Sequence, residues 1–260
     1  MKLTKMILGL FSLLGLSTLA LHVQASTDYI QIKQNQRIIA DAVRIDRLEQ
    51  LQLVLNNQQG IAYKKFNAIQ KAFPKCQLSF AMNAGMYHAN FSPVGLYIEQ
   101  FQQRSPLNLS TTQFGNFFLQ PNGIVAWNKK QAVILTTKQY AQSNFKAEFA
   151  TQSGPMLLLN GKINSIFSPS SNSLKIRNGV GIKNNQLYFV ISREKMNFYD
   201  FANIFKTQLK VDQALYLDGS ISSAFIPQAK RHDQIYDLGP MIVYSESQNC
   251  DEFKKISKTK

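Results

Sequence analysis

Four polar clusters follow apolar runs in the chain, where a buried strand would present side chains from its end. They are Asn83-Ala84-Gly85-Met86, Thr151-Gln152-Ser153-Gly154-Pro155, Arg177-Asn178-Gly179-Val180-Gly181 and Leu217-Asp218-Gly219-Ser220-Ile221-Ser222-Ser223. Glycine lets a backbone approach a ligand closely. Arg177 has the geometry to donate a forked pair of hydrogen bonds to a phosphate or carboxylate. Asp218 follows four apolar strand residues and is expected to be partly buried, where burial and a nearby arginine would shift the pKa of its carboxyl in opposite directions.

Each cluster also has a purely structural interpretation. Glycine-rich segments are often ordinary turns, and Asp218-Gly219 fits that description. Asn83 is equally compatible with a hydrogen-bonded amide in the core. Arg177 and Asp218 could pair with each other as a structural salt bridge.

Several familiar catalytic patterns are missing. Ser153 lies in Gln-Ser-Gly-Pro, which lacks the glycines two residues before and after the serine of a nucleophile elbow. His88 and His232 lie far apart without metal-ligand spacing, and no Walker-type phosphate loop occurs. These residues therefore predict neither a bound metal nor a cofactor.

Short apolar runs predict the strands that would position these clusters. Strands are expected at residues 42–46, 51–55, 78–82, 94–98, 214–217 and 240–244. Turn residues predict three hairpins, which join 117–119 to 124–127, 156–159 to 162–163, and 180–182 to 187–191.

Two segments have helical periodicity. Apolar residues spaced three or four apart predict one amphipathic helix over 62–73, ending before Pro74. A second helix is predicted over 197–209, with Asn197 as its N-cap and Asp200 near its positive end. Together, the predicted strands, hairpins and helices indicate an α+β fold: a mixed, mostly antiparallel sheet with hairpins and at least two packed helices.

The N-terminus has the layout of a secretory signal peptide, residues 1–25. Lys2 and Lys5 precede an apolar run of residues 6–21, and Val23-Gln24-Ala25 offers small residues to a signal peptidase. An uncleaved anchor is the alternative, although the run is short for a membrane span. We expect an exported protein, periplasmic or secreted, with residues 26–260 forming a single domain without a stable membrane span.

The charge of the chain suggests the class of partner. The formal net charge is +14 over 260 residues, and signal cleavage removes two lysines to leave +12. A basic exported protein is attracted to anionic glycans or other phosphate-bearing surfaces, although the charge also serves simple solubility. Nucleic acid is not expected as a partner, since the lysines are spread along the chain.

Cys76 and Cys250 are the two cysteines of the chain, and such a pair in an exported protein can form a disulfide.

The order of the four clusters, together with Ser92-Pro93-Val94-Gly95, resembles the phosphodiester glycosidase family over residues 78–244. This family includes the lysosomal enzyme that uncovers mannose-phosphate by removing a masking N-acetylglucosamine. The closest resemblance is to a bacterial branch of exported proteins. The resemblance implies hydrolysis of a sugar-1-phosphodiester at the anomeric carbon.

The resemblance also implies roles for single residues. Arg177 would clamp the phosphate, and Asp218 would act as base or nucleophile, with Glu194 as the second carboxylate. The residues expected to bind substrate are Asn83, Gly85, Gln152, Ser153, Asn178, Gly219 and Ser222. No cofactor is implied.

The chain departs from the family pattern at three glycine positions in two motifs. Ala84 stands where the family has the first of two glycines, and Ser220-Ile221 stands where it has glycines after Gly219. This change keeps two alternatives open. One is a non-catalytic binding protein for anionic envelope glycans, and the other is a phosphodiesterase that acts at phosphorus.

Overall fold

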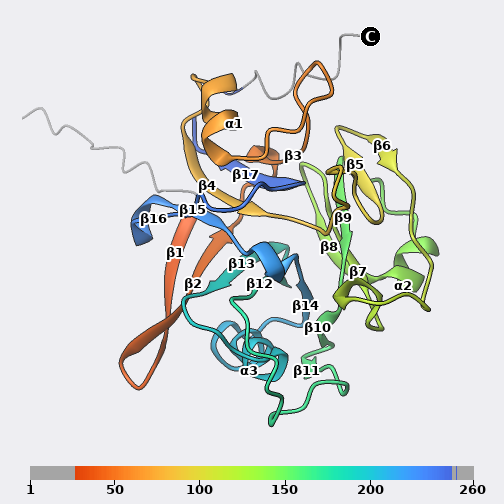
Figure 1. The fold of residues 1–260 in the computed structure, drawn as a ribbon, viewed down its shortest axis with the longest axis vertical. Coiled ribbons are helices and arrows are strands. Elements are labelled where there is room, and N and C mark those ends of the chain that lie inside the picture. Colours follow the sequence, from red (N-terminus) through yellow and green to blue (C-terminus); the bar gives the residue numbers. More distant parts are fainter. Residues whose placement is uncertain (1–26, 248–249, 251–260) are drawn as a thin grey trace, which may run out of the picture.

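The computed structural model describes residues 27–247 and 250, which form three antiparallel sheets. The predicted signal peptide and the C-terminal tail lie outside the described residues. Figure 1 shows the sheets meeting around a common interior, with helix α1 and helix α3 on opposite sides of the molecule. The predicted α+β class with mostly antiparallel pairing is confirmed.

The seven-stranded sheet has the order β1-β2-β13-β12-β14-β10-β11. Its strands are β1 (Thr27–Gln34), β2 (Arg37–Ile45), β10 (Met156–Leu159), β11 (Lys162–Ile163), β12 (Asn178–Lys183), β13 (Gln186–Ser192) and β14 (Gln213–Tyr216). Along β13, Leu187 and Phe189 face the shared interior, whereas Tyr188 and Val190 face helix α3. Both faces of this sheet are therefore buried, which explains the continuous apolar runs in its central strands.

The other two sheets have five strands each. The first has the order β16-β15-β4-β17-β3, with β3 (Leu51–Val54), β4 (Leu78–Asn83), β15 (Ala224–Ile226), β16 (Arg231–His232) and β17 (Met241–Ser245). The second has the order β6-β5-β9-β7-β8, with β5 (Tyr97–Glu99), β6 (Gln102–Ser105), β7 (Gly123–Trp127), β8 (Ala132–Thr136) and β9 (Phe149–Ser153).

Three short helices cover the outer faces of the sheets. They are α1 (Phe66–Ala72), α2 (Thr137–Ala141) and α3 (Phe198–Asn203), and α3 continues as π-helical turns over Ile204–Leu209. Asn197 caps α3 as predicted, since its Oδ1 accepts from the backbone N–H of Asp200 at 2.8 Å. No helix in the described part of the chain is long and apolar enough to cross a membrane.

Two hairpin predictions are confirmed and one is wrong. Asn160-Gly161 joins β10 to β11, and Asn184-Asn185 joins β12 to β13, with positive φ at all four turn residues. By contrast, residues 116–118 form a short 3-10 helix, and β7 pairs with β8 and β9 instead. The proline in Gln120-Pro121 fits this outcome, because proline lacks the N–H that a central strand needs.

The first helix begins later than predicted. The pattern over 62–73 predicts a helix from residue 62, but α1 begins at Phe66. Ala62 and Lys64 form isolated bridges with Asn56 and Leu238, and Lys64 has a φ of +63°. Tertiary pairing of the preceding segment therefore shortens the helix at its N-terminal end.

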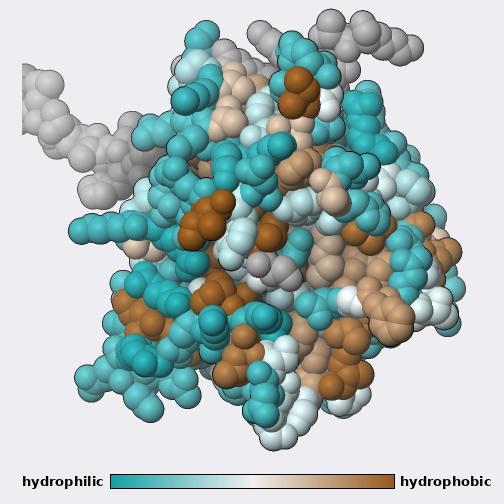
Figure 2. Space-filling model, in the orientation of Figure 1, coloured by the Kyte–Doolittle hydropathy of each residue, from teal (hydrophilic) through white to brown (hydrophobic). Residues whose placement is uncertain are grey.

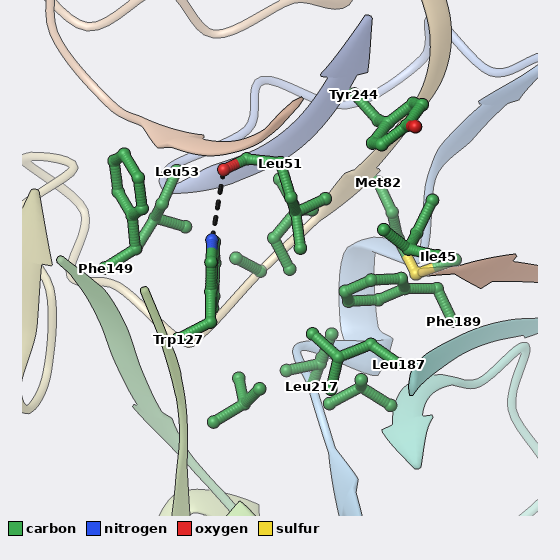
Figure 3. Packing of buried hydrophobic residues seen from close by; sticks show 14 of the residues in the cluster. Ile45, Leu51, Leu53, Met82, Trp127, Phe149, Leu187, Phe189, Leu217 and Tyr244 are labelled. Carbon is green, nitrogen blue, oxygen red and sulfur yellow. Dashed lines mark hydrogen bonds between the residues drawn. The ribbon is translucent and has the colours of Figure 1, made fainter. Parts of the chain in front are cut away.

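The common core lies where the three sheets meet. Figure 3 shows Trp127 and Phe149 of one sheet packed toward Leu51 and Leu53 of a second, with Phe189 of the third nearby. The Trp127 indole N–H donates to the backbone oxygen of Leu51 at 3.0 Å. This bond lets a buried indole satisfy its donor inside the core.

The surface is mixed in character. On the face in Figure 2, hydrophobic side chains appear in separate groups between hydrophilic ones. Cys76 and Cys250 form a disulfide that ties Cys250, which lies C-terminal to β17, to the segment before β4.

Candidate functional site

Strand ends from two sheets meet at one buried polar cluster. Asn83 is the last residue of β4, Asn178 is the first of β12, and Asp218 follows β14. Ser222 and Ser223 complete what we call the Asn83 cluster. The structure thus brings together four residues that the sequence proposes for the site, namely Asn83, Asn178, Asp218 and Ser222.

The two asparagine amides hold this cluster together. Asn178 Nδ2 donates to the backbone O and to Oδ1 of Asn83, at 3.0 and 2.9 Å. Asn83 Nδ2 donates to the Asp218 backbone oxygen at 2.6 Å, and the Ser223 N–H donates to Asn83 Oδ1 at 2.9 Å. Both amides are buried and hydrogen-bonded within the protein, so they position the loop that carries Asp218.

Asp218 lies at the edge of the cluster and is partly exposed. Its backbone N–H donates to the Ala84 oxygen at 3.1 Å. Burial, followed by the nearby charge of Asp218, raises the pKa of the Tyr87 hydroxyl to about 12. Burial also raises the pKa of Tyr216 to about 12, with Asp218 raising it further and Arg177 opposing. The Asp218 carboxylate therefore lies near two phenols that stay protonated at neutral pH.

Arg177 is buried rather than open to solvent. Its guanidinium donates from Nε to Met196 O at 2.7 Å, from Nη2 to Ser173 O at 2.7 Å and from Nη1 to the Tyr216 hydroxyl at 3.3 Å. It also lies 3.7 Å above the centre of the Phe198 ring. Burial lowers the pKa of this arginine below its usual range. Arg177 reaches the cluster through Tyr216.

Gly219 is pressed against Tyr216. A methyl group added at Gly219 would come within 1.7 Å of the Tyr216 hydroxyl oxygen, so a side chain has no room there. This close approach lets the chain turn between Asp218 and Ser222. The close backbone approach expected for Gly219 is therefore made to the protein's own Tyr216.

A cavity of about 400 Å³ opens beside this loop. Gly219, Ser222 and Ser223 form one side of it. The charged residues that line it are Lys175, Lys195, Arg231 and Asp233. Three cations facing one carboxylate make the cavity attractive to an anion. Gly219, which lines this cavity, directly follows Asp218 in the chain, so an anion held here would lie close to the Asp218 loop.

Two carboxylates orient Arg231 in this cavity. Its Nε donates to Asp233 Oδ2 at 2.7 Å, and its Nη1 lies 3.4 Å from Oδ2 of Asp41. Asp41 is fully buried and also accepts a two-pronged contact from Arg193, with Nε and Nη2 at 2.8–3.0 Å. These bonds link the cavity to β2 in the seven-stranded sheet.

The remaining predicted site residues lie elsewhere. Gln152 is buried in β9, where Oε1 accepts from the N–H groups of Leu96 and Asn108 at 3.0 and 2.9 Å. Gly85 packs against β9, since an added methyl would come within 2.3 Å of Thr151 Oγ1. Ser153 Oγ is buried and has no hydrogen-bond partner among the described residues.

Glu194 lies at the surface. Its side chain is 38% exposed and pairs with Arg37 at the start of β2. The described contacts of Glu194 connect it to this pair rather than to the Asn83 cluster. Its role as second carboxylate stays a prediction.

Sequence patterns did not point to the residues that surround Asp218. The sequence does not distinguish Tyr87 and Tyr216 from ordinary core residues, because an aromatic residue near a strand end usually packs in the core. Lys175, Lys195 and Arg231 come from three separate segments and meet only in the folded chain. The close spacing of Arg231 and Asp233 was the one local signal for this cavity.

Comparison with known proteins gives consistent results. A family model described as phosphodiester glycosidase matches residues 77–239. The uncharacterized protein YigE of Escherichia coli K12 is 44% identical over 169 residues, 64% of this chain and 65% of that protein, so the match spans just under two thirds of YigE.

Solved structures share the fold. One is the zebrafish N-acetylglucosamine-1-phosphodiester alpha-N-acetylglucosaminidase catalytic domain, auto-inhibited by its pro-peptide. It matches with a TM-score of 0.57 at 13% identity, over 85% of this chain and 82% of that chain. A hypothetical protein from Synechocystis gives 0.57 and 13%, over 84% of this chain and 61% of that chain.

Proposed function

The chain belongs to the phosphodiester glycosidase family, and from this premise we propose that it hydrolyses a sugar-1-phosphodiester at the anomeric carbon. The proposed substrate resembles an N-acetylglucosamine-1-phosphodiester. The observation that carries the proposal is the cationic cavity beside Gly219, the residue that follows Asp218. A phosphodiester is an anion, and this cavity presents Lys175, Lys195 and Arg231 to it.

In the proposed reaction, water attacks the anomeric carbon. The bond between that carbon and the phosphate oxygen breaks, and the electron pair leaves with the phosphate monoester. The lysines and Arg231 stabilise this departing charge, so little proton donation is needed. Asp218 takes the proton from the attacking water, or attacks first as a nucleophile and is released by water.

The buried groups around Asp218 support this chemistry by orientation. Asn83 and Asn178 hold the backbone of the Asp218 loop. Arg177 contacts the Tyr216 hydroxyl, against which Gly219 packs. We assign Arg177 a positioning role through Tyr216. Direct contact of Arg177 with phosphate is the alternative, and the stability and diester binding of Arg177→Met distinguish the two roles.

The first test is release of sugar from the methyl phosphodiester of N-acetylglucosamine-1-phosphate. We expect free N-acetylglucosamine, and in water enriched in heavy oxygen we expect the label in the sugar. Label in methyl phosphate would instead indicate attack at phosphorus. Binding of the diester without any sugar release would identify a binding protein and overturn the hydrolase proposal.

Substitutions at Asp218 and at the cavity lysines test whether the reaction takes place at this site. Asp218→Asn is expected to abolish sugar release while the melting temperature stays near that of the wild type. Lys175→Ala and Lys195→Ala are expected to raise KM, because each removes a cation from the cavity. Lys206→Ala is the matched control, since this lysine is exposed on the π-helical turns after α3. If the control loses as much affinity as the cavity variants, general charge rather than the cavity binds the diester.

We also propose that the protein is exported. Support comes from the N-terminal pattern of basic, apolar and small residues and from the Cys76–Cys250 disulfide, which persists best in an oxidising compartment. Mass spectrometry of the chain purified from the cell envelope is expected to find Ser26 as the first residue. A chain that retains Met1 in the cytoplasm would contradict export.

A further inference from the structure

A second and larger cavity, of about 670 Å³, lies away from the Lys175–Arg231 cavity. It is enclosed by the loop between β3 and α1, the turn at residues 90–93 and the β5–β6 hairpin. Its size falls within the range of small-molecule sites. The proposed reaction does not use it.

A carboxyl group lines this cavity. Glu99 ends β5, and alternation along the strand places it on the same face as Tyr97. The Tyr97 hydroxyl donates to Glu99 Oε2 at 3.2 Å, and it is the one hydrogen-bonding partner of Glu99 among the described residues. The other carboxyl oxygen therefore keeps its capacity to accept hydrogen bonds from a ligand.

Two asparagines supply the complementary donors. Asn57 Oδ1 accepts from the N–H groups of Gln59 and Ile61 at 3.0 and 2.9 Å. Asn90 Oδ1 accepts from the backbone N–H and hydroxyl of Ser92 at 3.1 and 2.7 Å. These bonds fix both amides by their oxygens. The nitrogens have no acceptor in the part of the chain that the structure describes, and both residues line the cavity.

The charges in the cavity nearly balance, unlike those beside Asp218. Lys64 is 3.6 Å from Asp237 and lies 4.5 Å above the Phe91 ring. Arg104 provides the remaining cation opposite Glu99. A cavity whose charges nearly balance and whose lining contains amides and one carboxyl favours a neutral, hydroxyl-rich ligand over an anion.

From these contacts we infer that the cavity binds a neutral saccharide, whose hydroxyls would pair with the Glu99 carboxyl and the amides of Asn57 and Asn90. The cavity adjoins the catalytic region through one aromatic pair. Phe91, which lines the cavity, stacks on Tyr87 with ring centres 5.6 Å apart, and the charge of Asp218 acts on Tyr87. The site does not rest on hydrolysis, because its test measures binding alone.

The experiment uses N,N′-diacetylchitobiose as probe and titrates it into ¹⁵N-labelled full mature chain. We expect saturable shifts of the Asn57 and Asn90 signals. Glu99→Leu is expected to weaken binding roughly tenfold or more, since it removes a hydrogen bond to a charged group. Glu49→Gln is the matched control, because Glu49 is an exposed carboxylate in a different segment. It is expected to bind the probe as the wild type does.

The pH dependence gives an independent readout. Burial raises the pKa of Glu99 to about 7, while Tyr97 and Arg104 lower it. Lys64 also lines the cavity, and the charge of Glu99 acts on the nearby Tyr63 hydroxyl. Probe affinity is therefore expected to rise as the pH passes through 7 in the wild type but not in Glu99→Gln. Absence of shifts at Asn57 and Asn90, or equal binding by Glu99→Leu, would overturn the inference.

The two proposals fail separately. Asp218→Asn is expected to bind the probe at this cavity with unchanged affinity. Absence of sugar release by the wild-type protein, together with intact probe binding, would remove the hydrolase proposal and leave the saccharide site. Sugar release without any probe binding would do the reverse.

Discussion

The side-chain nitrogen of Asn178 lies 2.9 Å from Oδ1 of Asn83, although 95 positions separate the two residues in the chain. They belong to different sheets, so this bond joins the seven-stranded sheet to the sheet that contains β4. Because Asn83 in turn holds the Asp218 backbone, the pair sets where the proposed base lies.

Asn178→Ala is expected to lower the free energy of unfolding by about 1–3 kcal/mol, because it removes the side-chain donor to the buried backbone oxygen of Asn83 and one of the two donors to its Oδ1. Urea denaturation measures the change. Asn144→Ala, at an exposed position, is the control and is expected to change little. Equal losses in the two variants would mean that the amide pair contributes nothing specific.

Arg177→Met keeps an unbranched side chain at this buried position but is shorter than arginine, and it removes every guanidinium donor and the charge over Phe198. We expect a loss of stability on the order of 3 kcal/mol, since Met196 O and Ser173 O lose charged partners. Tyr216→Phe removes the neutral hydroxyl that accepts from Arg177 and is expected to cost less, about 1 kcal/mol. A fully stable Arg177→Met variant that fails to bind the diester would instead favour direct contact of Arg177 with phosphate.

The Cys76–Cys250 disulfide encloses most of the domain, with the two cysteines 174 positions apart. Loss of a bridge across so long a loop is expected to cost about 2–5 kcal/mol, because the unfolded chain gains freedom. Thermal unfolding with and without reductant measures this. The double variant Cys76→Ala, Cys250→Ala should unfold at one temperature under both conditions. If the wild type has the same melting temperature with and without reductant, the disulfide is not formed in solution.

Glu99 is expected to make stability depend on pH. Burial raises its pKa from 4.5 to about 7, so the folded protein holds this proton more tightly than the unfolded chain does. The contribution is full below pH 4.5 and is lost as the pH rises through 7. Glu99→Gln should therefore gain stability relative to wild type between about pH 5 and about pH 8, on the order of 1–3 kcal/mol. If the stabilities of the wild type and Glu99→Gln change in parallel with pH, the pKa of the Glu99 carboxyl is not raised.

Local patterns in the sequence were enough for much of the fold. The turns at Asn160-Gly161 and Asn184-Asn185, the cap at Asn197 and most strands follow from residues within a few positions of one another. The predicted hairpin around Pro121 was wrong because the partner of β7 comes from distant β9. Residues 62–64 were placed in a helix for the same reason, since their pairing partners lie far along the chain or across a loop.

The sequence by itself determined the α+β class, the family and the strand-end positions of Asn83, Asn178 and Asp218. Only the tertiary structure decided which of the polar residues share a site. Arg177 became a buried support because α3 brings Phe198 over it, and Lys175, Lys195 and Arg231 became the cations of the cavity. The physical reason is range: periodicity and turn chemistry act between near neighbours, whereas burial and electrostatic environment depend on segments that meet only after folding.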